Sequence, residues 1–208
     1  MEIVELLASP VHRFEGRPAD GPAPAPEGES VGEIRIRAGL GIVGDRYFNH
    51  PAHRDASITV IARESLPAGA GLAQARRNIL VAGLRLAGAP ARSPAPDTGG
   101  SPAPEAADSP GPTAAGSPAV QAGGSPGGLT LDDLVGATLT LDSGDGPVHL
   151  SVRRRANPCA WMDVTIGPGA WKALRGRGGV RCVPLNDGIL RVGPLSATIR
   201  FPDERNQH

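Results

Sequence analysis

Aromatic residues and lysine are scarce in this sequence. Phe, Trp and Tyr together make up 3% of the 208 residues, so a hydrophobic core has to be built from Val, Leu, Ile and Ala. Lys172 is the single lysine among 21 basic residues. The other basic residues are arginines, whose planar guanidinium suits phosphate or carboxylate better than an ammonium does. The formal net charge is zero, so bulk charge indicates neither nucleic acid nor a membrane as a partner.

Cysteines and long apolar runs are also few. The two cysteines, Cys159 and Cys182, make no disulfide framework. Residues 1–5 lack the basic region and the apolar region of a signal peptide, and no apolar run reaches the length of a membrane span. These absences predict a protein of the reducing cytoplasm that does not cross a membrane.

Glycine and proline are abundant, with 29 and 22 residues, and they are concentrated in one segment. Residues 88–128 are almost entirely Ala, Pro, Gly and Ser, and Val120 is their only large aliphatic residue. Such a segment cannot bury enough apolar surface to offset the entropy of ordering it. Because closure entropy grows slowly with loop length, a long insertion is tolerated. We therefore predict a single domain over residues 1–208 with a disordered surface insertion at 88–128.

Short stretches with strand character recur along the rest of the chain. In residues 31–38, Ile34 and Ile36 alternate with charged side chains, as in a strand with one buried face. Asp-Gly at 187–188 fits the tight turn of a hairpin. The predicted strands are 2–8, 31–38, 57–61, the hairpin 137–141 with 148–152, the hairpin 180–185 with 189–192, and 195–201. The predicted helices (62–66, 72–77 and 170–174) are brief, so the expected class is mainly β, a sandwich or a barrel.

The most informative stretch is 153–163, in which a predicted strand runs into three arginines, a proline and Cys159. Nearby cations lower the pKa of a cysteine, and the thiolate is both a nucleophile and a metal ligand. The alternative is that Cys159 is a small buried hydrophobe beside Trp161 and Met162. Cys182 lies inside a predicted strand, where a core side chain is the better interpretation.

Two other segments suggest ligand binding less clearly. Residues 39–46 contain three glycines, but the spacing and the lysine of a phosphate loop are absent, so a turn that brings Asp45 and Arg46 towards a pocket is the better interpretation. His50 and His53 have a spacing that suits a metal on one helical turn. Pro51 between them argues against a helix, and a solvated loop is the better interpretation.

Several short elements follow one another in a recognisable order: Gly-Asp-Arg at 44–46, Arg-Asn-Ile at 77–79, Leu-Val-Gly at 134–136, Pro158-Cys159 with Met162, Gly-Arg-Gly-Gly at 176–179, Asn-Asp-Gly-Ile at 186–189, and Val-Gly at 192–193. Together they resemble a MOSC domain, the family named for the C-terminal domain of molybdenum-cofactor sulfurase. One departure is that the His-Gly-Gly that follows Gly-Asp-Arg in the family is replaced here by residues 50–55.

The resemblance implies a MOSC-type β-barrel that binds the molybdenum cofactor (molybdopterin), an anionic pterin with a phosphate. It also implies that Cys159 either carries sulfur as a persulfide, with a separate sulfur-donor protein, or ligates molybdenum. In the second case the protein is an oxidoreductase that reduces N-hydroxylated compounds with an electron-donor protein. A non-catalytic cofactor carrier is a third alternative. The expected cofactor-binding residues are Arg46, Arg77, Asn78, Arg153, Arg155, Asn157, Arg177 and Gly178. Strand alternation places Arg153 and Arg155 on one face and Arg154 on the other.

Overall fold

The structure, a computed structural model, describes residues 1–84 and 130–202, and the predicted insertion 88–128 lies outside them. Within these ranges the chain is mainly β with three short α-helices, as the sequence predicts. The strands are β1 (Glu2–Leu7), β2 (Ser30–Val31), β3 (Glu33–Arg37), β4 (Gly41–Ile42), β5 (Ile58–Ala62), β6 (Ile79–Ala82), β7 (Thr138–Asp142), β8 (Val148–Arg155), β9 (Val180–Pro184), β10 (Gly188–Arg191), β11 (Gly193–Pro194) and β12 (Ser196–Arg200). The helices are α1 (Leu72–Ala75), α2 (Trp161–Thr165) and α3 (Ala170–Ala173), with 3₁₀ turns η1 (Pro18–Asp20), η2 (Pro51–His53), η3 (Arg63–Ser65) and η4 (Leu131–Leu134). None of the described helices is long and apolar enough to cross a membrane.

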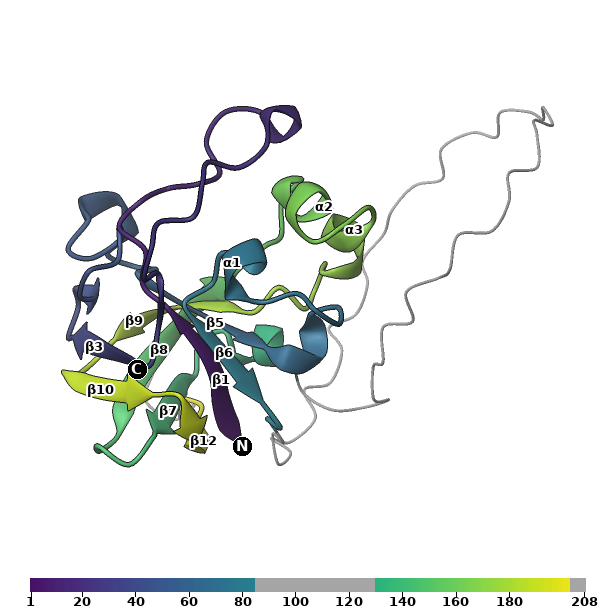
Figure 1. The fold of residues 1–208 in the computed structure, drawn as a ribbon. Coiled ribbons are helices and arrows are strands. Elements are labelled where there is room, and N and C mark those ends of the chain that lie inside the picture. The colour runs from purple at the N-terminus through teal and green to yellow at the C-terminus, as the bar shows by residue number, and fades with distance from the viewer. Residues whose placement is uncertain (85–129, 203–208) are drawn as a thin grey trace, which may run out of the picture.

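Most of the strands belong to one curled sheet with the order β11-β1-β6-β5-β9-β8-β7-β12 (Figure 1). All neighbours in this order are antiparallel except β5 and β6, which run parallel. The two end strands, β11 and β12, follow each other in the chain through Leu195, whose N–H donates to the Met1 carbonyl at 3.1 Å. No strand pair in the described ranges joins β11 to β12. The predicted barrel is therefore an open one.

A second, smaller sheet has the order β10-β3-β4. Ile34 and Ile36 in β3 are buried and the charged residues between them face outward, as the alternation predicts. The predicted hairpin of 180–185 with 189–192 is wrong, because β10 pairs with β3 while β9 lies between β5 and β8. Asp187, in the turn between β9 and β10, accepts from the Ala38 N–H at 2.8 Å and so ties this turn to the end of β3. The predicted hairpin of 137–141 with 148–152 is confirmed as β7 and β8.

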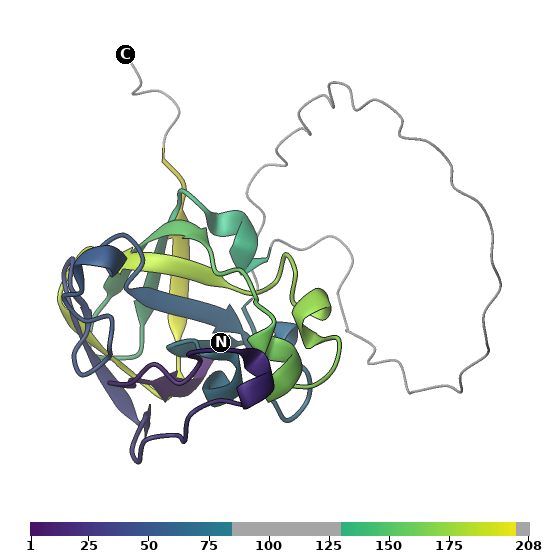
Figure 2. The ribbon, with the colours of Figure 1, turned by 90° about the horizontal axis from the view of Figure 1, so that it is seen from above.

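Two hydrophobic clusters stabilise the fold. The larger one fills the interior of the sheets with Ile, Leu and Val side chains, as the low aromatic content requires. The smaller one packs α1, α2 and α3 against the outer side of β1, β5 and β6, with Trp161 and Met162 among its members. The three helices thus lie together at one end of the barrel (Figure 1). The segment around η1 joins them there (Figure 2), where Phe14 stacks on Trp161 with ring centroids 5.1 Å apart.

Candidate functional site

Cys159 lies on the short connection between β8 and α2. Its side chain is exposed, and its carbonyl accepts from the Met162 N–H at 2.9 Å. Cys182 lies in β9 and is fully buried, and burial raises the pKa of its thiol. A reactive thiol has to be accessible and a structural one does not. Of the two cysteines, only Cys159 is therefore placed for chemistry, and the alternative that it is a buried hydrophobe is wrong.

The buried side chain of Arg77 fixes the backbone that leads to Cys159. Its guanidinium donates to the carbonyl oxygens of Ala156 at 2.7 Å and Gly178 at 3.1 Å, and it also reaches the Asn157 carbonyl at 3.5 Å. It therefore ties the Cys159 loop, residues 156–160, to residues 176–179. Burial and then the charge of Arg181 lower the pKa of Arg77 to about 10, and Cys159 is the strongest influence in the opposite direction. The Cys159 loop and Arg181 are thus both electrostatic neighbours of Arg77.

Two glycines allow the close approach of these segments. A Cβ on Gly178 would lie 2.4 Å from the Ala156 carbonyl oxygen, and one on Gly179 would lie 2.1 Å from that of Val60. Gly179 also has φ +84°, a conformation that L-residues rarely adopt. Its carbonyl accepts from the Ala156 N–H at 2.7 Å, and its own N–H donates to Asp132 Oδ2 at 3.0 Å. Gly178, a predicted cofactor-binding residue, therefore has a structural role beside the Cys159 loop.

Asn78 is a junction between distant segments. Its Oδ1 accepts from the N–H and the hydroxyl of Thr59 at 3.0 and 2.7 Å, and its Nδ2 donates to the Leu7 carbonyl at 3.1 Å and to Asp45 Oδ2 at 3.0 Å. All four hydrogen-bonding positions of the amide are therefore used within the protein. Asp45 in turn accepts from the Tyr47 N–H at 3.0 Å. Asn78 thus has no free position for a ligand, and it supports the turn that carries Arg46 and Tyr47.

That turn contributes to a group of basic and aromatic side chains that we call the cation cluster: Arg46, Tyr47, His53, Arg154 and Arg181. The guanidinium of Arg46 lies 4.3 Å from the centre of the Tyr47 ring, and the Tyr47 and His53 rings are 4.0 Å apart. Arg154 of β8 is the cross-strand partner of Arg181 in β9. The cluster therefore combines one turn, one 3₁₀ element and two neighbouring strands.

Among the described residues, the cation cluster has positive charges without an ion pair and polar atoms without a hydrogen-bond partner. In the described part of the chain, none of its three arginines has an ion pair. Arg46 Nε, Arg181 Nη1 and His53 Nδ1 are buried without a hydrogen-bond partner there. Like charges directly across two strands destabilise a sheet, and buried polar atoms normally have partners. An anionic ligand would relieve both costs, because charge-assisted hydrogen bonds to guanidinium are strong.

Within the cluster, burial and the neighbouring charges both shift pKa values. Burial lowers the pKa of Arg181, the Tyr47 hydroxyl beside it raises it, and Arg154 and Arg46 lower it. Burial also lowers the pKa of His53, followed by the charges of His50, Arg181, Arg154 and Arg46. With its pKa lowered from the ordinary 6.5, His53 is mostly neutral near pH 7.

The sequence identified Arg46 of this cluster and missed Arg154 and Arg181. Strand alternation correctly put Arg154 and Arg155 on opposite faces, since Arg154 pairs with Arg181 and Arg155 pairs with Val180, but the cofactor-binding residues were predicted on the face of Arg155. Arg154 faces the cluster, while Arg155 Nε donates to the Asp132 carbonyl at 3.1 Å. The sequence feature that could have pointed to Arg181 is its charge within the otherwise apolar strand Val180–Pro184.

The other predicted site residues lie around the Cys159 loop. Arg153 and Asn157 are exposed, and Arg177 is half-buried with its N–H bonded to the Leu174 carbonyl at 3.1 Å. The structure brings none of the three into the cation cluster. The two-histidine segment was predicted to be a solvated loop, and residues 50–55 are indeed exposed except His53, which is half-buried with its Nδ1 covered.

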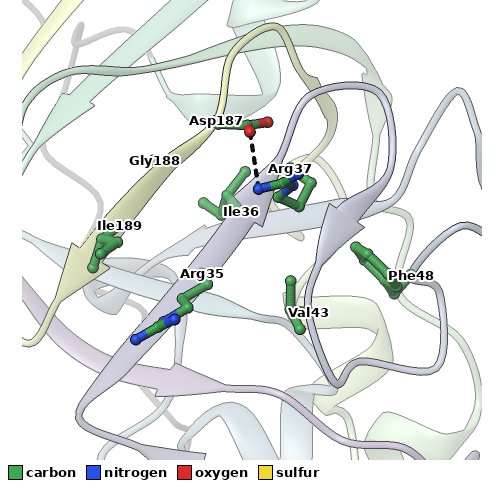
Figure 3. A pocket seen from close by; sticks show the side chains of 8 residues that line it. All are labelled: Arg35, Ile36, Arg37, Val43, Phe48, Asp187, Gly188 and Ile189. Carbon is green, nitrogen blue, oxygen red and sulfur yellow. Dashed lines mark ion pairs between the residues drawn. The ribbon is translucent and has the colours of Figure 1, made fainter.

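A cavity of about 450 Å³ lies elsewhere, over β3 and β10 (Figure 3). Its lining includes the Arg37–Asp187 ion pair, with 3.2 Å between Nη1 and Oδ2. Neither Cys159 nor a residue of the cation cluster lines it. Its one acidic residue neutralises one of its arginines, so it offers no excess charge like that of the cluster. The unpartnered polar atoms, and not this cavity, mark the candidate site.

Comparisons with known proteins support the fold. No family model matches the sequence, and no curated protein matches it. Among solved structures, the crystal structure of the YuaD protein from Bacillus subtilis is similar, with a TM-score of 0.54 over 97% of this chain and 96% of that chain. The two sequences are 13% identical. At that identity the likeness shows a shared fold and nothing about activity.

Proposed function

We propose that this chain is a MOSC-domain protein that binds the molybdenum cofactor and that Cys159 carries sulfur as a persulfide. The observation that supports the proposal most is the exposed Cys159 on a loop held by buried Arg77, whose pKa also responds to Arg181 of the cation cluster. An accessible thiol and unpaired guanidinium groups are what sulfur delivery to an anionic acceptor requires.

The unpartnered polar atoms of the cluster fit a phosphate. Arg46 Nε and Arg181 Nη1 are N–H donors without a partner in the described ranges, and Arg154 adds a third positive charge opposite Arg181. These residues would hold the anionic end of the cofactor, and the bound cofactor would supply the chemistry of its molybdenum centre. Arg153, Asn157 and Arg177 remain proposed contacts near the Cys159 loop. Arg77, Asn78, Arg155 and Gly178 contact the protein itself and position the site.

Sulfur transfer through Cys159 needs two successive exchanges. The Cys159 thiolate attacks the terminal sulfur of a persulfide on a donor protein, so that the donor's S–S bond breaks, the donor leaves as a thiolate and an S–S bond forms on Cys159. A nucleophilic acceptor then supplies the electron pair for its new bond to that outer sulfur, and the S–S bond on Cys159 breaks with its electron pair returning to the Cys159 thiolate. Both partners have to reach the same atom in turn, and the exposure of Cys159 permits this.

The test is to purify the protein from a host that makes the cofactor and to measure its pterin, molybdenum and cyanide-labile sulfur. Cys159→Ser should lose the labile sulfur and keep the pterin. Cys182→Ala is the matched control, because that thiol is fully buried, and it should keep both. Circular dichroism checks that each variant is folded.

Other outcomes would overturn parts of the proposal. Loss of molybdenum from Cys159→Ser, with no labile sulfur in the wild type, would make Cys159 a metal ligand and favour the reductase of N-hydroxylated compounds. Full labile sulfur in Cys159→Ser would remove Cys159 from the reaction. Wild-type protein without pterin, molybdenum or labile sulfur would contradict cofactor binding altogether.

A further inference from the structure

His53 differs from the other members of the cation cluster because its charge can change near neutral pH. Its ring is in contact with the Tyr47 ring at 4.0 Å and lies 5.0 Å from the ring of His50. Its Nδ1 is buried and has no partner among the described residues. A buried imidazole nitrogen without a protein partner has an unmet hydrogen bond, which a bound ligand or a proton would satisfy.

All the charged groups that shift the pKa of His53 are basic side chains. The charges that bear on it come from His50, Arg181, Arg154 and Arg46, and all of them lower its pKa, as burial does. Arg46 in turn acts on His12, another titratable group nearby. No carboxylate is among the groups that shift His53. An anion bound at the unpartnered guanidinium nitrogens would therefore be the first negative charge beside this ring, and it would favour the protonated imidazolium.

We propose that the cation cluster binds an oxyanion with two negative charges, such as a phosphate monoester, and that His53 takes up one proton from solvent when the anion binds. The inference extends the proposed function, since the same cluster would hold the phosphate of the cofactor. Arg46, Arg154 and Arg181 supply permanent charge, and His53 supplies a fourth that exists only in the complex. By linkage, an anion that favours protonated His53 binds more tightly as the pH falls.

Linkage also sets the size of the effect. Where free His53 is neutral and bound His53 is protonated, one proton enters per anion, and the affinity rises by about tenfold for each unit that the pH falls. Below the pKa of His53 in the free protein, or above its pKa in the complex, the affinity no longer depends on this group. The coupling is therefore expected within the range over which histidine side chains generally titrate, about pH 5–8.

The experiment is calorimetric titration of the full chain, purified from a host that lacks the cofactor, with sulfate as the probe. Sulfate keeps two negative charges over this pH range, so any proton taken up is bound by the protein. Titration in two buffers of different ionisation enthalpy at each pH gives the number of protons. Wild type should bind sulfate with uptake of up to one proton, and the affinity should rise towards about tenfold per unit as the pH is lowered.

Substitutions assign the proton to His53. His53→Gln and His53→Asn should still bind sulfate through the arginines but without proton uptake and without the rise in affinity. His50→Gln and His12→Gln, at the neighbouring histidines, should keep both. Proton uptake that survives in both His53 variants would overturn the proposal, and so would sulfate binding to wild type without uptake, or no binding at any pH. Because the measurement involves no sulfur transfer, its outcome is independent of the labile-sulfur test of Cys159.

Discussion

Replacement of Arg181 with methionine should stabilise the free protein. The guanidinium of Arg181 lies across from Arg154 in the neighbouring strand, and its buried Nη1 has no partner among the described residues. Like charges across strands cost about 0.2–1 kcal/mol, and an unsatisfied buried donor costs about 1–3 kcal/mol. Methionine keeps most of the aliphatic stem and its packing. We expect the free energy of unfolding to rise by about 1–2 kcal/mol.

The same substitution should remove the response of the protein to anions. A ligand that binds only the native state stabilises it by RT ln(1 + [L]/Kd), about 2.7 kcal/mol at a hundredfold excess over Kd. Urea unfolding followed by circular dichroism, with and without sulfate, measures both effects. Wild type should gain stability from sulfate, whereas Arg181→Met should be more stable without sulfate and gain little from it.

Arg77→Met is the matched control, since it makes the same chemical change at a buried arginine with protein partners. It leaves the carbonyls of Ala156 and Gly178 without their donor, and loss of such buried bonds should cost about 3–5 kcal/mol. The two arginines should therefore respond with opposite signs. The reasoning is refuted if Arg181→Met destabilises the protein by more than about 1 kcal/mol or keeps the full stabilisation by sulfate.

Two further predictions concern the backbone and pH. Gly179→Ala should cost more than about 3 kcal/mol, because φ is +84° and the added Cβ would meet a carbonyl oxygen at 2.1 Å. Gly136→Ala, at φ +91° with no atom within 4 Å, should lower the free energy of unfolding by only about 1–2 kcal/mol. Urea unfolding measures both variants, and equal losses of stability in Gly179→Ala and Gly136→Ala would contradict the prediction. The pKa of His53 is lowered on folding, so the unfolded chain binds more protons and anion-free stability should fall as the pH drops below about 6.5. His53→Gln should flatten that dependence, and an unchanged slope would show that other groups cause it.

Local patterns predicted much of the fold but only one of the two expected hairpins, that of β7 with β8. Alternation placed Ile34 and Ile36 in the core correctly, because a half-buried strand needs that period. The hairpin expected around Asp187 failed because β9 has both its edges occupied, by β5 and β8, and β10 pairs with β3. Turn residues indicate that the chain reverses, but long-range packing selects the partner strand.

The candidate site was predictable only in part for the same reason. An exposed cysteine after a basic strand could be anticipated, since the arginines and the proline adjoin it in sequence. Arg154 was missed because strand alternation shows which side chains share a face, but not that the face of Arg154 is the one that carries Arg181. Arg181 and His53 join the cluster through strand pairing and a distant turn, and no short motif encodes those contacts. The roles of Asn78 and Gly178 as supports became visible only with their hydrogen bonds and close contacts.

One measurement tests most directly whether Cys159 and the cation cluster form one site. It compares the rates at which the Cys159 thiol of the native protein reacts with two aromatic disulfides, of which one carries two carboxylates and the other is uncharged. Cys182 is fully buried and should not contribute until the protein unfolds. At low salt, Arg154→Met and Arg181→Met should each slow the anionic reagent by about 3–10-fold and leave the uncharged reagent nearly unaffected. A ratio of the two rates that is the same in wild type and both variants would contradict the account, as would a native Cys159 that reacts with neither reagent.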